Sequence, residues 1–143
     1  MKKYYFFTLF LLFVPLQAVS TIELKLAELE NKDKLGVSIY NYSKSKIKLD
    51  YIMCVEPHTG ISFLIEDMKG KVFSQSTTLN SGCSLSNKII VDRHGILGKI
   101  IDKDLVDILY SPPHKKLYVT ALLCENYFTM EKCLFSNKIL VDF

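Results

Sequence analysis

Apolar and polar residues alternate along much of this chain. Ile22, Leu24 and Leu26 stand between polar neighbours, and the same two-residue spacing recurs further on. This period is typical of strands that bury one face and expose the other. The expected strands cover residues 22–26, 35–39, 47–51, 61–65, 72–76, 89–91, 117–123 and 135–143. The pattern therefore predicts antiparallel sheets that cover one apolar core.

Turn-forming residues separate these segments. Residues 41–45 combine Asn, Ser and Lys, and residues 67–70 predict a hairpin loop in which Gly70 supplies a positive φ. The segment 96–110 is less regular, and we expect a turn or short helix around residues 104–109. About seven or eight short strands at this spacing predict an all-β fold, an antiparallel two-sheet β-sandwich.

The first 20 residues have the pattern of a secretory signal. Two lysines precede an apolar run over residues 4–14, and the small residues Ala18 and Ser20 follow at the spacing that signal peptidase accepts. The run is shorter than the ~20 residues of a membrane-spanning helix. We therefore expect a signal peptide over residues 1–20, cleaved after Ser20 or Ala18, and one β-sandwich domain over residues 21–143. The domain should reach the periplasm or the exterior, with no integral membrane span.

The charge of the expected domain does not favour nucleic acid as a partner. Of the 18 lysines and arginines, two lie in the predicted signal, and 15 acidic residues balance the rest. Lys44, Lys46 and Lys48 stand at alternate positions, which predicts a solvated face or a protected sheet edge. We therefore expect no phosphate-binding surface.

All four cysteines, Cys54, Cys83, Cys124 and Cys133, lie in the expected domain. An even number of cysteines in an exported chain predicts disulfides, and four cysteines allow three pairings. A hairpin would bring Cys124 and Cys133 together, which leaves Cys54 with Cys83. The spacing contains no C-x-x-C pair, so a zinc site is not expected.

Three short motifs point to a known kind of domain. They are a strand and hairpin that run from Phe63 to Gly70, a late strand with Tyr118 and Val119, and a closing strand that contains Leu134, Phe135, Ser136 and Asn137. With these motifs the chain resembles small exported bacterial domains of immunoglobulin-like type over most of its expected mature part. It more distantly resembles a bacterial proteinase-inhibitor sandwich. The resemblance implies an immunoglobulin-like sandwich and implies no particular activity.

The sequence offers no residue set for catalysis. His58, His94 and His114 each stand beside Pro or Gly in an expected turn. None of them has the nucleophile and orienting carboxylate that a catalytic triad needs. We therefore expect a protein that is not an enzyme and that has no catalytic residues and no cofactor.

For two further motifs we favour a structural role and not a binding or modification site. Asp102, Asp104 and Asp107 are closely spaced, but apolar residues interrupt them and no Gly or Glu of a calcium loop follows. We expect a solvated turn or helix cap there, and no metal site. Asn41 and Ser43 fit a glycosylation sequon, which we interpret as turn chemistry.

These observations favour an exported, non-catalytic binding module. Such a module would recognise a protein or cell-envelope ligand through its loops or a sheet edge. The loops that concentrate His, Pro, Gly and basic residues contain His58, Arg93, His94, His114 and Lys115. The alternatives are an inhibitor or immunity protein that blocks a specific enzyme or toxin, and an adhesin or structural subunit.

Overall fold

The computed structural model describes residues 21–31, 33–50, 52–55, 60–77, 89–113, 116–124 and 132–143. The expected signal peptide lies outside this part of the chain. The described elements are β1 (Ile22–Glu28), β2 (Lys34–Asn41), β3 (Ile47–Leu49), β4 (Ile61–Glu66), β5 (Val72–Phe73), β6 (Ile89–Val91), β7 (Ile96–Asp102), α1 (Lys103–Tyr110), β8 (Lys116–Leu123) and β9 (Leu134–Asp142). No helix among these residues has the length and apolar character to cross a membrane.

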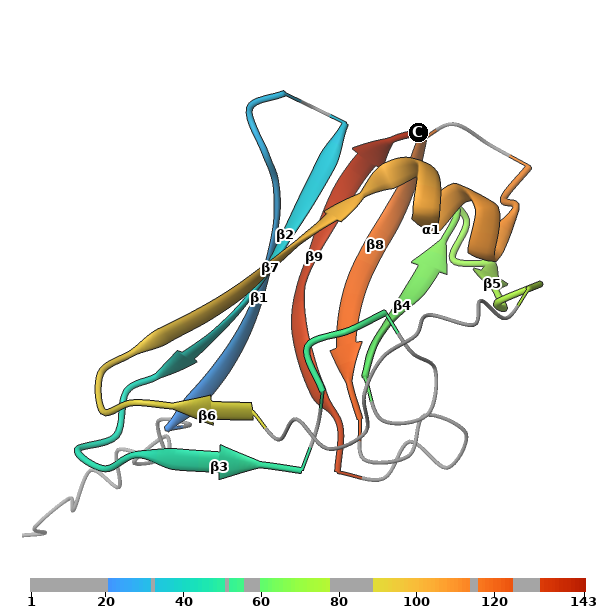
Figure 1. Ribbon diagram of the computed structural model, residues 1–143. Coiled ribbons are helices and arrows are strands. Elements are labelled where there is room, and N and C mark those ends of the chain that lie inside the picture. Colours follow the sequence, from blue (N-terminus) through green and yellow to red (C-terminus); the bar gives the residue numbers. More distant parts are fainter. Residues whose placement is uncertain are drawn as a thin grey trace, which may run out of the picture.

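The strands form antiparallel sheets, so the prediction of an all-β fold is confirmed. Their order is β1-β2-β7 in one sheet, β5-β4-β8-β9 in a second, and β3-β6 in a two-stranded ribbon. We expected two sheets, and the ribbon is separate because β3 and β6 pair only with each other in the described part of the chain. In Figure 1, β7 runs as one long strand up to α1, and the two-stranded pair of β3 and β6 lies near the other end of β7.

Side chains from both larger sheets share one apolar core. In β2, Leu35, Val37 and Ile39 are completely buried, and the residues between them are only partly covered. The same core contains Phe63 of β4 and Leu117 of β8, together with further strand residues and part of α1. In β2 the two-residue period of the sequence therefore matches the burial of alternate side chains.

The segment expected to hold a turn or short helix forms α1, which begins at Lys103 and ends at Tyr110. Its buried side includes Val106, Leu109 and Tyr110, while Asp104 and Asp107 are exposed. The Phe63 N–H donates a hydrogen bond of 2.8 Å to the Tyr110 hydroxyl. This contact gives a partner to a backbone group of β4 on the edge that the short β5 does not reach.

The hairpin after β4 has the expected geometry. Gly70 has a φ of 82°, and its N–H donates to the Asp67 carbonyl at 3.0 Å. The returning strand is shorter than expected and ends at Phe73. Instead of continuing the ladder, the Ser76 N–H donates to the Leu109 carbonyl at 2.8 Å, at the end of α1.

A disulfide joins Cys124 and Cys133, the pairing that the hairpin between β8 and β9 favoured. The two residues follow β8 and precede β9, with their Cα atoms 4.1 Å apart. Cys54 is also disulfide-bonded. Its expected partner, Cys83, lies outside the described residues, so that pairing stays a prediction.

A β-bulge in β9 connects the two larger sheets. Thr120 pairs with Lys138 and Leu122 pairs with Phe135, so one residue of β8 faces two residues of β9. The bulged residues are Ser136 and Asn137 of the motif in the closing strand. The Ala121 N–H donates to the Ser136 hydroxyl at 2.8 Å, which replaces the lost ladder bond.

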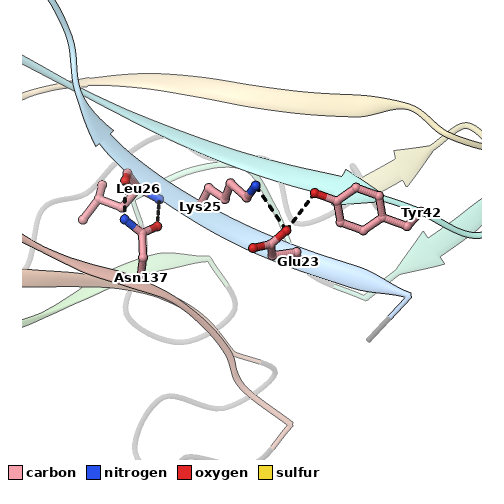
Figure 2. A network of polar contacts seen from close by, with 5 residues as sticks. All are labelled: Glu23, Lys25, Leu26, Tyr42 and Asn137. Atoms are coloured by element: carbon pink, nitrogen blue, oxygen red, sulfur yellow. Dashed lines mark hydrogen bonds and ion pairs between the residues drawn. The ribbon is translucent and has the colours of Figure 1, made fainter. Parts of the chain in front are cut away.

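The bulge turns the Asn137 side chain toward β1. The Leu26 N–H donates to Asn137 Oδ1 at 2.9 Å, and Asn137 Nδ2 donates to the Leu26 carbonyl at 2.9 Å (Figure 2). The amide therefore offers β1 the donor and acceptor that a neighbouring strand would offer. This bridge joins the edge of β1 to β9, which lies against it.

Replacement of Asn137 by alanine should lower the free energy of unfolding by about 1–2 kcal/mol, because Leu26 loses two partners for its backbone. Urea unfolding followed by circular dichroism measures this loss. A loss below about 0.5 kcal/mol, the scale of an ordinary surface substitution, would show that the bridge is dispensable.

Candidate functional site

The structure describes two of the five loop residues that the sequence singled out. Arg93 and His94 are exposed in the turn between β6 and β7. His94 has a φ of 52°, and the Gly95 N–H closes the turn on the Asp92 carbonyl at 2.9 Å. His58, His114 and Lys115 lie outside the described residues, so their role in binding stays a prediction.

Asn41, at the end of β2, holds this turn in place. Its side chain is 1% exposed. Its Nδ2 donates to the carbonyls of Ser45 at 2.9 Å, Val91 at 3.2 Å and Asp92 at 2.8 Å. Its Oδ1 accepts from the N–H and hydroxyl of Ser43 at 2.9 and 2.6 Å. One buried amide thus organises residues 41–45 and fixes them to the end of β6.

The loop after β2 and the turn after β6 form one tip of the molecule. The His94 N–H donates to the Ser43 carbonyl at 3.4 Å, and Lys46 Nζ lies 2.9 Å from Asp92 Oδ1. Of the three lysines expected at alternate strand positions, only Lys48 lies in a strand, β3, while Lys44 and Lys46 belong to this loop. Lys44 and Lys46 lie in a loop and not in a strand because the Asn41 side chain provides hydrogen-bond partners for the backbone of this loop.

The sequon at Asn41 forms a turn, as expected from the residue types. Because Nδ2 makes three hydrogen bonds inside the fold, this nitrogen is not accessible to a glycosyl donor in the folded chain.

The outer face of the β1–β2 pair carries four interacting side chains, which we call the tyrosine platform: Glu23, Lys25, Tyr40 and Tyr42. The rings of Tyr40 and Tyr42 stack with their centroids 6.0 Å apart and an interplanar angle of 14°. Lys25 Nζ lies 4.7 Å from the centroid of the Tyr40 ring. The Tyr42 hydroxyl donates to Glu23 Oε2 at 2.7 Å, and Lys25 Nζ lies 3.3 Å from the same oxygen (Figure 2).

Strand geometry explains why these residues meet. Tyr40 lies on the face of β2 opposite to Leu35, Val37 and Ile39, since side chains alternate along a strand. Glu23 is directly opposite Tyr40 in the ladder. In the sequence, Glu23 and Lys25 are simply the polar neighbours of Ile22, Leu24 and Leu26. Two tyrosines two residues apart, on the face away from the buried positions, were the signal that would have found the platform.

The platform keeps its charges at neutral pH. The hydrogen bond from Tyr42 holds the pKa of the Glu23 carboxyl below its ordinary value, and Lys25 acts in the same direction. The Glu23 carboxylate raises the pKa of Lys25 and of the Tyr42 hydroxyl. The hydroxyl therefore remains a donor. The network is lost as the pH falls through the lowered pKa of Glu23, and also as the pH rises through the raised pKa of Tyr42.

In the Glu23→Gln variant, the pKa of Tyr42 should fall toward the ordinary tyrosine value, because the neighbouring negative charge is gone. Titration of chains with ¹³C-labelled tyrosine by NMR measures this change, and the Tyr42→Phe variant identifies the signal. An unchanged Tyr42 titration would contradict the contact.

A shallow cavity lies elsewhere, at the hairpin after β4. Its volume is about 350 Å³, and its described lining is Asp67, Met68, Lys69 and Lys116. This lining offers no nucleophile with a neighbouring base. Within the described ranges, no three His, Cys, Asp or Glu side chains gather closely enough to hold a metal ion.

Two comparisons of the sequence with known proteins find no match. No protein-family model matches its sequence. A search of curated proteins finds none that is similar to it. The immunoglobulin-like resemblance therefore remains a prediction.

Proposed function

We propose that this protein is an exported, non-catalytic binding module that recognises a protein or cell-envelope ligand through the tyrosine platform and the adjoining tip. The stacked pair formed by the half-buried Tyr40 and the exposed Tyr42 carries the proposal. Tyr42 remains 47% exposed although its hydroxyl and ring both have partners. Tyrosine is enriched in binding surfaces because it combines a large apolar ring with a polar end.

The contacts around the tyrosines favour binding. Glu23 and Lys25 restrict the two rings in the free protein, so less conformational entropy is lost when a ligand covers them. The tip beside them adds the exposed cation Arg93. A ligand with an amphipathic, partly acidic surface would suit this combination.

The disulfide and the apolar core support the proposed location and the proposed fold. The disulfide between Cys124 and Cys133 favours an oxidising compartment, hence export to the periplasm or the exterior. The core shared by the two larger sheets supports an immunoglobulin-like sandwich. In that arrangement the tyrosine platform lies on the solvent side of one sheet.

The chain itself supplies a matched control. On the outer face of the other large sheet, Lys138 Nζ lies 5.8 Å from the centroid of the Tyr118 ring and forms an ion pair with Glu66. This cluster has the same three residue types as the platform but only one tyrosine. It tests whether any partly exposed tyrosine beside a lysine would bind.

The experiment is quantitative capture from envelope and secreted extracts of the source organism with three baits. The baits are the wild-type chain, the double variant Tyr40→Ser with Tyr42→Ser, and the control Tyr118→Ser. We expect a ligand that the wild type and the control retain and the double variant loses by about tenfold or more, the scale of a binding hot spot. Equal capture by all three baits would refute the platform.

The same experiment distinguishes an inhibitor or immunity protein from a binding module that does not inhibit its ligand. If the captured ligand is an enzyme or toxin, its activity is measured with one equivalent of the chain. Loss of activity favours an inhibitor or immunity protein, and full activity favours a binding module that does not inhibit.

A further inference from the structure

Strand β7 lies at one edge of the three-stranded sheet. It pairs with β2 on one side, and no other described strand pairs with it. The opposite edge of the sheet is different, because Asn137 bridges β1 to β9. Along β7, Ile96 is 63% exposed and Ile100 is 60% exposed. A long strand with exposed apolar side chains and an unpaired edge is a template for strand pairing.

The backbone of β7 presents a regular ladder at this edge. The Asn41 N–H donates to the Gly95 carbonyl at 3.0 Å, so the pair of Asn41 and Gly95 is hydrogen-bonded. In antiparallel sheets the hydrogen-bonded pairs recur at every second residue. The intervening residues, Ile96, Gly98 and Ile100, therefore direct their N–H and carbonyl groups away from β2. Their side chains lie on the same face as Tyr40, which is opposite Ile96.

We propose that β7 pairs antiparallel with β7 of a second copy of this chain, about a twofold axis at Gly98. This register places Ile96 opposite Ile100 of the second copy, twice, with the two Gly98 residues between them. It also brings the negatively charged Asp102 close to the turn of the second copy, which carries the positively charged Arg93. The two three-stranded sheets then form one six-stranded sheet. The inference goes beyond the proposed function and does not depend on it.

Lys99 selects this register. Its side chain belongs to the other face of β7, opposite Val37 in the ladder with β2. A twofold axis one residue later would set the two Lys99 side chains against each other, which is destabilising. An axis one residue earlier would leave Ile100 opposite the turn rather than opposite Ile96. With the axis at Gly98, each Lys99 instead faces Leu97 of the second copy.

The arrangement has a consequence for binding. A twofold axis perpendicular to the sheet keeps both outer faces on one side, so the dimer would display two tyrosine platforms together. Two platforms on one surface would raise the avidity for a repeated or surface-bound ligand.

Sedimentation equilibrium of the full chain tests the dimer. A strand-edge contact is smaller than the ~1,200 Å² of a stable interface, so we expect a weak, concentration-dependent dimer. The double variant Ile96→Lys with Ile100→Lys should be monomeric over the same range. The control Ile108→Lys changes an equally exposed isoleucine of α1, 57% exposed, and should dimerise like the wild type. A wild-type chain that stays monomeric up to about 1 mM would overturn the proposal, as would equal loss in the control.

A mixing experiment tests the register. An Ile96→Lys chain mixed with an Ile100→Glu chain should form a heterodimer about fivefold or more tighter than either homodimer, because opposite charges face each other. High salt should remove this gain. The control mixture, Ile96→Lys with Ile96→Glu, should show no gain, since these positions do not meet. Equal gains in the two mixtures would exclude the axis at Gly98. These variants leave Tyr40 and Tyr42 intact, so failure to dimerise is distinguishable from failure of the platform.

Discussion

Replacement of Asn41 by alanine is expected to lower the free energy of unfolding by about 3 kcal/mol. The substitution removes one donor from each of three carbonyl groups, those of Ser45, Val91 and Asp92. The Asp92 and Ser45 carbonyls keep a second donor, the Gly95 N–H at 2.9 Å and the Ser43 hydroxyl at 2.8 Å. An unsatisfied buried polar group costs about 1–3 kcal/mol. Because the loop is partly exposed, water replaces some of these contacts, and the total stays below the sum.

The Asn41→Asp variant distinguishes the role of the amide nitrogen as a donor from the role of the amide oxygen as an acceptor. Aspartate keeps the acceptor for Ser43 but has no donor for the three carbonyls, so we expect a loss about as large as for alanine. The control is Asn31→Ala, at an exposed position. Urea unfolding measures all three variants. Full stability of Asn41→Asp would mean that the donors of the amide do not hold the tip.

Replacement of Lys103 by methionine is the second large effect, a loss of about 2–3 kcal/mol. The Lys103 side chain is 8% exposed, forms an ion pair with Glu28, and donates to the Asp142 carbonyl at 2.8 Å. It therefore ties the start of α1 to the ends of β1 and β9. Removing one partner of a buried pair costs about 3–5 kcal/mol. The expected loss is smaller here because the Glu28 side chain is 32% exposed.

The chain contains a matched exposed pair. Lys34 Nζ lies 3.7 Å from Asp102 Oδ1, with side chains 43% and 70% exposed. The Lys34→Met variant should lose less than about 1 kcal/mol. In addition, the double variant Glu28→Gln with Lys103→Met should recover part of the lost free energy of unfolding, because it removes the Glu28 charge that has no partner once Lys103 is replaced. Thermal unfolding of the four chains distinguishes the pairs, and similar losses at Lys34 and Lys103 would contradict the account of α1.

Much of the fold follows from local sequence patterns. Alternation in β1, β2 and β4 predicted the buried positions because one face of each strand covers the core. The turn at Gly70 was also predicted, and so was a turn or short helix around residues 104–109, where the structure has α1. Such features depend mainly on neighbouring residues. In β7 the pattern misleads, because Ile96 and Ile100 are apolar but lie on the exposed face of an edge strand.

The contacts that assemble the candidate site depend on residues far apart in the chain. Asn41 reaches a carbonyl 50 residues away, and Asn137 binds Leu26 across 111 residues. An isolated asparagine in the sequence predicts a turn, and nothing local distinguishes one that is buried by tertiary structure. The tyrosine platform was missed for a related reason, since it needs the register of two strands to bring Glu23 to Tyr42.

The most direct test of the central claim, that a ligand covers the tyrosine platform, is hydroxyl-radical footprinting of the chain with and without the captured ligand. If the account is right, oxidation of Tyr40 and Tyr42 falls when the ligand is added, while oxidation of Tyr118 stays constant. If Tyr40 and Tyr42 are oxidised at the same rate in both samples, the ligand binds elsewhere and the platform is not the binding site.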